Sequence, residues 1–141
     1  MDKKQTIKIA KNILLGKNKP SALLRFLCWF TLIWDGLLLL YFFSSAIVFW
    51  VSDVSFSDNP LLEGFTKEFC FTLGVIHSVS FLSAALMYRL KKTGFYLYVI
   101  ANISLVVAPF IYLNSIKADY IVVVFTLIMI GLFTSQFKKL S

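Results

Sequence analysis

Residues 25–51 read RFLCWFTLIWDGLLLLYFFSSAIVFWV, and this stretch decides the fold. It starts with a basic residue, has aromatic residues at both ends, and is apolar throughout apart from Asp35 and a few small polar residues. An α-helix needs about 20 predominantly apolar residues to cross a bilayer. We therefore expect a membrane-spanning helix here, and its single acid is the first candidate for a functional residue.

The composition of the whole chain agrees with a membrane protein. Of its 141 residues, 59% are hydrophobic and 17% are aromatic, with a mean hydropathy of +0.81. A soluble domain is about 45–50% apolar, and a small soluble domain has too little interior to hide 15 Phe residues. The net charge of +7 is therefore assigned to membrane topology rather than to a nucleic-acid partner.

The hydropathy pattern predicts an all-α fold, a four-helix transmembrane bundle with a short amphipathic N-terminal helix. Residues 1–24 form the basic segment, and residues 25–141 form one membrane domain. Small residues recur at helical spacing in the second and third spans, which lets helices pack closely in lipid. The four predicted spans cover about residues 26–51, 69–88, 95–113 and 120–137.

Local signals refine the predicted spans. Residues 58–60 read DNP, a capping side chain followed by proline, so the second helix is expected to start outside the membrane. Tyr96 and Tyr98 follow the basic turn and are expected at the basic end of the third span, with Tyr112 at its far end. Pro109 removes a backbone hydrogen bond and predicts a kink near the end of the third span.

The N-terminal segment carries six lysines against one acid. On a helical wheel Lys4, Lys8 and Lys11 lie opposite an apolar side, which predicts an amphipathic helix on an anionic lipid surface. A disordered basic tail is the alternative interpretation. As a helix, these lysines would bind the lipid bilayer, and the segment could act as a membrane-surface sensor.

The distribution of positive charge predicts the orientation of the chain. Twelve Lys and Arg residues lie in the N-terminus through Arg25, the turn between the second and third spans, and the C-terminus, whereas Lys67 and Lys117 alone lie on the other side. Short loops rich in Lys and Arg stay in the cytoplasm. We expect a multi-pass protein of the bacterial inner membrane with both termini cytoplasmic.

Asp35 lies about ten residues into the first span, or ~15 Å along the helix, near the middle of the membrane. A charged group at that depth costs about 2.5–3.5 kcal/mol on insertion scales, so it should face protein or water. Cys28, Thr31, Phe42 and Ala46 share its side of the helical wheel. This side is the predicted bundle-facing surface.

His77 in the second span and Asn102 in the third fall at a similar depth because adjacent helices run in opposite directions. The sequence predicts an intramembrane polar cluster of Asp35, His77 and Asn102. Three interpretations remain open: a proton relay or cation site, a structural hydrogen-bond cluster that fixes helix register, and a polar face that docks against a partner protein.

No catalytic constellation or cofactor motif is found in the sequence. A single His argues against a His-rich metal site, and no GxSxG, HExxH or Gly-rich phosphate loop is present. Cys28 and Cys70 are placed near opposite membrane faces, too far apart for a disulfide. We expect a protein that is not an enzyme and has no catalytic residues, no metal and no cofactor.

Two resemblances arise from these patterns. A lone acid in the first of four short spans is similar to the small multidrug resistance transporters, in which that acid couples protons to drug export. The chain also resembles small four-span membrane proteins of Bacteroidota through FLCWFTLIWDGLLLL at residues 26–40 and MYRLKKTGFYLYVIANI at residues 87–103. That group has no established activity and commonly has a small residue at the Asp35 position, so no role for Asp35 follows from it.

These observations leave two main functional hypotheses. The first is a non-catalytic accessory or scaffold subunit that packs against a membrane-protein partner or a second copy of the chain. The second is a small proton-coupled transporter or channel that uses Asp35 and His77.

Overall fold

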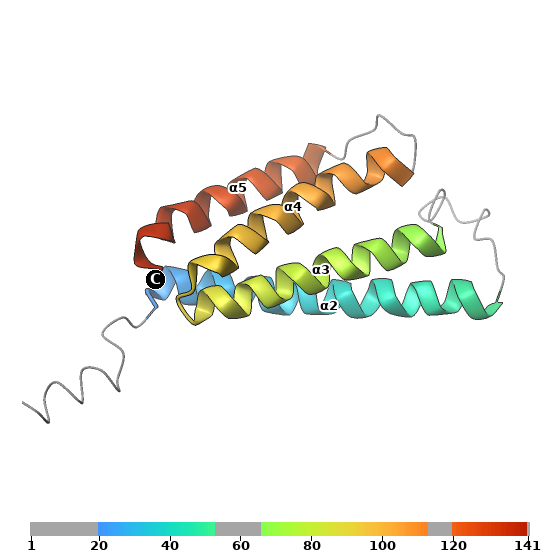
Figure 1. Ribbon diagram of the computed structural model, residues 1–141, viewed down its shortest axis with the longest axis horizontal. Helices are drawn as coiled ribbons and strands as arrows, with labels where there is room; N and C mark the ends of the chain where they lie inside the picture. Colours follow the sequence, from blue (N-terminus) through green and yellow to red (C-terminus); the bar gives the residue numbers. More distant parts are fainter. Residues whose placement is uncertain (1–19, 53–65, 113–119, 141) are drawn as a thin grey trace, which may run out of the picture.

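The computed structural model describes residues 20–52, 66–112 and 120–140, and all of its regular structure is helical (Figure 1). The predicted all-α class is confirmed. Helices α2 and α3 lie side by side over their length, α4 packs against α3, and α5 runs beside α4. The elements are α2 (Ala22–Ser52), α3 (Lys67–Tyr88), α4 (Lys92–Tyr112), α5 (Tyr120–Gln136) and the short 3₁₀ helix η1 (Phe137–Lys139).

Three of these helices, α2, α3 and α4, are long and apolar enough to cross a membrane. The 31 residues of α2 correspond to ~46 Å of helix, which exceeds the ~30 Å hydrocarbon core of a bilayer. Helix α5 has 17 residues, about 26 Å, the lower limit for a span. The fourth crossing, predicted at residues 120–137, therefore stays a prediction.

Side chains of the neighbouring residues define two helix starts. The Ser21 hydroxyl accepts a hydrogen bond from the Leu24 amide at 3.2 Å, so α2 begins just after Pro20 and before the predicted position 26. The Thr66 hydroxyl accepts from the Phe69 amide at 3.2 Å and caps α3. The predicted helix start at residues 58–60 lies outside the described residues.

The turn between α3 and α4 is short, and backbone hydrogen bonds tie it to the last turn of α3. Lys91 donates its amide to the Leu86 carbonyl at 3.0 Å, and Leu90 adopts φ 60°. This left-handed residue reverses the chain direction after α3. A Cβ on Gly94 would lie 2.6 Å from the Ser83 carbonyl oxygen, so only glycine lets α4 approach α3 this closely.

Two apolar clusters hold the helices together. The larger one lies at the end of the bundle where α2 begins, and joins Leu24 and Cys28 of α2 to Met87, Tyr98 and Phe133. The Ser21 hydroxyl also donates to Gln136 Oε1 at 2.8 Å and ties α2 to the end of α5. The smaller cluster lies toward the other end and contains Phe69, Leu73 and Ala108.

The outward surface of α2 is made of large apolar side chains. Trp29, Leu40 and Trp50 are 57%, 66% and 64% exposed. Continuous apolar surfaces of this kind are rare on water-soluble monomers. They agree with a membrane environment for the three long helices.

Candidate functional site

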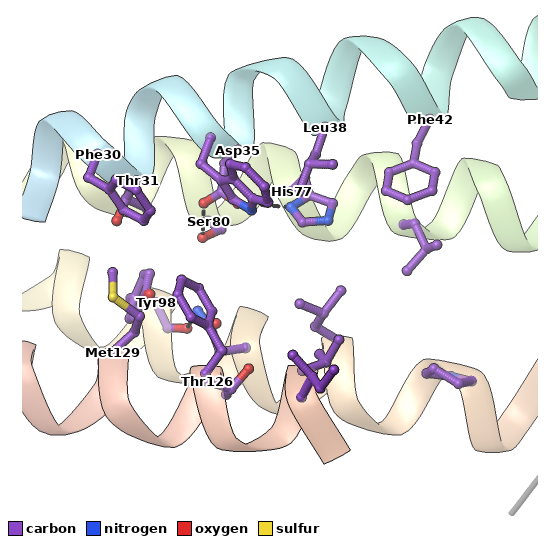
Figure 2. Close-up of a pocket in the computed structure, with 18 of the residues that line it drawn as sticks. Phe30, Thr31, Asp35, Leu38, Phe42, His77, Ser80, Tyr98, Thr126 and Met129 are labelled. Atoms are coloured by element: carbon purple, nitrogen blue, oxygen red, sulfur yellow. Dashed lines mark hydrogen bonds and ion pairs between the residues drawn. The ribbon is translucent and has the colours of Figure 1, made fainter. Parts of the chain in front are cut away.

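A cavity of about 670 Å³ lies between the α2–α3 pair and the α4–α5 pair (Figure 2). This volume falls within the range of about 300–1,000 Å³ found for small-molecule sites. Its polar lining residues gather toward one half, and the other half is apolar. The first half contains Thr31, Asp35, His77, Ser80, Tyr98, Asn102 and Thr126 together with Phe30, Trp34, Phe125 and Met129, and the apolar half contains Leu38, Phe42, Phe69, Leu73, Leu105 and Pro109.

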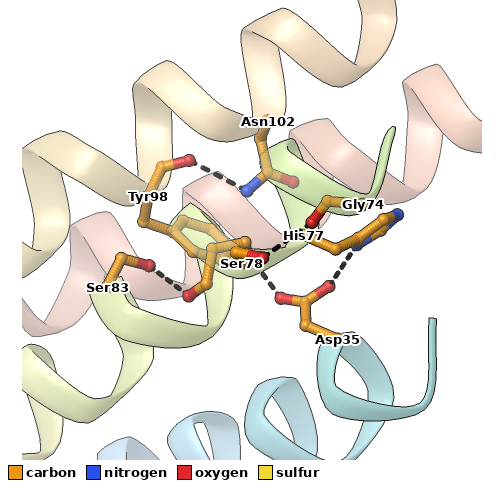
Figure 3. Close-up of polar contacts among 8 residues, drawn as sticks. Asp35, Gly74, His77, Ser78, Ser83, Tyr98 and Asn102 are labelled. Atoms are coloured by element: carbon orange, nitrogen blue, oxygen red, sulfur yellow. Dashed lines mark hydrogen bonds and ion pairs between the residues drawn. The ribbon is translucent and has the colours of Figure 1, made fainter. Parts of the chain in front are cut away.

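Asp35 is the centre of a buried hydrogen-bond network in the cavity wall (Figure 3). Its Oδ1 lies 2.9 Å from His77 Nδ1, and its Oδ2 accepts a hydrogen bond from the Ser80 hydroxyl. Asp35 is 7% exposed and His77 is 4% exposed. The carboxyl group in the first long helix is thus bonded by two side chains of the second.

The geometry of α3 brings both partners to Asp35. His77 and Ser80 are three residues apart and therefore share one face of the helix. The ring of Phe42 stacks on the imidazole with centroids 5.6 Å apart and an interplanar angle of 7°, which fixes the orientation of His77. The predicted inward face of α2 is confirmed, because Cys28, Thr31, Asp35 and Ala46 are buried and Phe42 is partly buried.

A second polar group faces Asp35 from across the cavity. The Tyr98 phenol lies close to Thr31 and Asn102 and within electrostatic range of Asp35. The Thr31 hydroxyl is buried but has no hydrogen-bond partner among the described residues. In Figure 2 the side chains of Thr31 and Asp35 point from α2 into the space above Tyr98.

The structure brings two members of the predicted polar cluster into direct contact and places the third nearby. Asn102 lines the same cavity, but its Nδ2 donates to the Tyr98 carbonyl of its own helix at 2.9 Å rather than to Asp35 or His77. Lys4, Lys8 and Lys11, predicted to bind the lipid surface, lie outside the described residues.

Two site residues were missed or misplaced by the sequence analysis. Ser80 was considered only as a small packing residue, although its spacing from His77 places both on one helix face. Tyr98 was expected only to lie near the basic end of its helix, whereas the structure places it in the core: Tyr98 is 3% exposed and its ring centroid lies 4.7 Å from that of Phe133. Helix α4 starts at Lys92, which places Tyr98 more than one turn inside the bundle.

The cavity reaches the surface between α2 and α5. These helices are joined near Ser21 and Gln136 and diverge toward the other end, as Figure 1 shows. Trp34 of α2 and Phe125 of α5 line the cavity and are 51% and 44% exposed. The rings of Phe30 and Phe125 lie 6.4 Å apart and form the main side-chain contact across this opening. We call the opening, bordered by Phe30, Trp34 and Phe125, the α2–α5 seam.

The chemistry of the site is that of a protonatable hydrogen-bonded pair in an apolar cavity. Histidine and a carboxylic acid can exchange a proton through their shared hydrogen bond. Within residues 20–52, 66–112 and 120–140, no group of three or more His, Cys, Asp or Glu residues could hold a metal ion. Cys28 and Cys70 are both buried free thiols.

Comparison of the chain with protein-family models, curated proteins and solved structures finds no match. Its site is therefore interpreted from its own geometry and chemistry.

Proposed function

We propose that the protein is a small proton-coupled transporter that binds an apolar substrate in the cavity. The observation that supports this proposal is the Asp35–His77–Ser80 network in the wall of a cavity large enough for a small molecule. An acid deep in a membrane helix is costly, and such residues commonly mark proton or substrate pathways. A purely apolar wall would have packed these helices without that cost.

In the proposed cycle, the Asp35–His77 pair exchanges a proton as substrate enters or leaves. A change in protonation alters the strength of the hydrogen bond between α2 and α3 and hence the relative stability of two helix arrangements. Tyr98 and Met129 of the larger apolar cluster line one end of the cavity, and the rest of this cluster packs behind them at that end. This packed end favours a carrier over an open channel. The charge bias of the loops supports an inner-membrane orientation with cytoplasmic termini.

The test is proton movement in proteoliposomes that contain the purified full-length chain and a trapped pH-sensitive dye. A pH gradient is imposed, and a panel of apolar amines, alcohols and acids is added in turn. We expect at least one compound to collapse the gradient faster than in empty vesicles, and Asp35→Asn and His77→Gln to abolish the acceleration. Ser44→Ala is the matched control, since Ser44 bonds the Leu40 carbonyl of its own helix at an exposed position. Unchanged fluxes in Asp35→Asn would refute the proposal.

A second candidate, an accessory subunit of a larger membrane complex, is supported by the α2–α5 seam. Helices α2 and α5 make few contacts beyond their joined ends, and a helix of a partner protein could insert between Trp34 and Phe125. Copurification of a partner from native membranes in mild detergent would support this role. Isolation of the chain only as a free monomer, with Trp34 still accessible to lipid-phase quenchers, would count against it.

A further inference from the structure

The polar residues that line the cavity gather toward one of its ends on α2, α3 and α4, where the apolar side chains of Phe30, Trp34, Phe125 and Met129 lie among them. Helix α2 presents Thr31 and Asp35 to one half and Leu38 and Phe42 to the other. Helix α4 repeats the pattern, with its polar residues preceding Leu105 in the apolar half. A cavity divided in this way matches a molecule with one polar end and one hydrocarbon end, because each end then meets its own kind of surface.

The buried Thr31 hydroxyl forms no hydrogen bond of normal geometry with the described residues, although the Tyr98 phenol lies close enough to interact with it. The Thr31 side chain lines the cavity, and the residue is 3% exposed. Buried polar groups in native structures are nearly always paired. Thr31 precedes Asp35 by one helical turn, so a polar group placed between them would reach both a hydroxyl and a carboxyl oxygen.

The charges of the site limit what that polar group can be. Among the described lining residues, Asp35 is the acid and His77 is the one base, and His77 Nδ1 is already directed at Asp35. A phosphate, sulfate or carboxylate head would therefore lie beside Asp35 without a free cationic partner, which is unfavourable in an apolar cavity. A head group that donates a hydrogen bond and carries no negative charge fits both Asp35 and Thr31.

We propose that the cavity binds an amphipathic molecule with a hydroxyl or amine head and a hydrocarbon body. The head bonds Thr31 and Asp35, and the body lies along Phe42 and Leu105. The molecule enters from the membrane through the α2–α5 seam, past Trp34. This inference rests on the proposed function for the role of the cavity, and adds the class of molecule and the residue Thr31 that recognises it.

Trp34 provides a reporter for binding because it lines the cavity at the seam. In a Trp29→Phe/Trp50→Phe variant it is the remaining tryptophan of the three in the chain. The full-length variant is placed in lipid nanodiscs and titrated with ω-brominated decanol, decylamine and decanoate, whose bromine quenches nearby tryptophan. A second variant that retains Trp29 and lacks the other two measures quenching from bulk lipid, since Trp29 is outside the cavity lining.

We expect saturable quenching of Trp34 by the alcohol and the amine, and only the bulk-lipid response with decanoate. Thr31→Val keeps the side-chain shape and removes the hydroxyl. It should raise the half-saturating concentration of the alcohol about two- to tenfold, the factor that corresponds to one net hydrogen bond. Thr134→Val is the matched control, because that hydroxyl bonds the Ile130 carbonyl at an exposed position of α5.

Three results would overturn the inference: saturable binding of decanoate with equal affinity, an unchanged half-saturating concentration in Thr31→Val, or no saturable quenching by any probe. Failure of the transporter proposal is distinguishable from these results. In that case the alcohol still binds and Thr31→Val still weakens it, but no compound accelerates collapse of the pH gradient in vesicles. Conversely, if proton flux depends on Asp35 but Thr31→Val binds the alcohol as well as the parent does, the transporter proposal stands and the inference about the ligand is refuted.

Discussion

A double-mutant cycle on Asp35 and His77 measures how strongly the hydrogen bond at the centre of the site couples α2 to α3. The single variants are Asp35→Ala and His77→Ala, and the third is their combination. Asp35→Ala removes the acceptor of both His77 and Ser80, so it should cost more than His77→Ala. Breaking a buried ion pair from one side costs about 3–5 kcal/mol.

The coupling energy distinguishes a neutral Asp35–His77 hydrogen bond from a charged one. Neutral hydrogen bonds between membrane helices contribute about 0.6 kcal/mol on average, whereas hydrogen bonds to charged groups contribute about 1.5–3 kcal/mol. The Asp35 Oδ1 to His77 Nδ1 distance of 2.9 Å and the low exposure of both residues make this a direct contact shielded from solvent, so the measured coupling energy distinguishes the neutral pair from the charged one. The bond from Ser80 and the stacking of Phe42 on His77 largely cancel in the cycle, because each is lost in one single variant and in the double variant.

The two cysteines supply the assay. Cys28 and Cys70 are 0% and 1% exposed, so a fluorogenic maleimide should label them only when the bundle opens. Unfolding is followed in mixed micelles at increasing denaturing detergent, and the free energies of the four proteins are compared. Ser44→Ala should stay within about 0.5 kcal/mol of the parent, as surface substitutions usually do. A coupling energy near zero would refute the contact between Asp35 and His77.

Substitutions at Gly94, Gly131 and Ser21 test the packing of the helices and the start of α2. Gly94→Ala should destabilise the bundle by about 1–3 kcal/mol, because its Cβ would overlap backbone atoms of α3. Gly131→Ala, which meets open space, should be neutral or stabilising by up to about 1 kcal/mol in the same thiol-labelling assay. Ser21→Ala should cost about 1–2 kcal/mol, since it removes both the α2 cap and the bond to Gln136. Ser21→Asp keeps an oxygen that can cap α2, so it should be more stable than Ser21→Ala. Equal free energies of unfolding for Ser21→Asp and Ser21→Ala would refute a capping role of Ser21.

The helical parts of the architecture could be predicted because they depend on local patterns. An apolar run of sufficient length indicates a helix, and the wheel around Asp35 identifies its buried face, since side-chain direction in a helix is fixed by sequence spacing. The depth of His77 followed from counting residues along antiparallel helices. These inferences need no knowledge of how tightly two helices approach.

The partners within the site could not be predicted in the same way because they depend on helix rotation and close approach. Asn102 has the expected depth, yet its side-chain amide donates to a carbonyl one turn earlier in its own helix. Asn side chains often form such local hydrogen bonds in place of bonds to another helix. The position of Tyr98 near the basic end of its helix gave no sign that its side chain would point into the bundle, where it is 3% exposed. The cavity itself arises from the divergence of α5 from α2, which no pattern within a single helix encodes.

The effect of Thr31→Val on the free energy of unfolding distinguishes a purely structural polar cluster from a binding site, because the two roles predict changes of opposite sign. If the polar residues only fixed helix register, Thr31→Val would remove a useful interaction and lower the free energy of unfolding. If the hydroxyl instead binds a ligand, it destabilises the ligand-free protein, because burying an unpaired polar group costs about 1–3 kcal/mol of lost solvation. Water that enters the cavity recovers part of that loss, so we expect Thr31→Val to stabilise the unliganded bundle by up to about 1 kcal/mol in the thiol-labelling assay. The same variant should bind decanol more weakly, and Thr134→Val should change neither quantity. A destabilised Thr31→Val protein would show that the hydroxyl is already satisfied in the folded chain, and that the cavity requires another explanation.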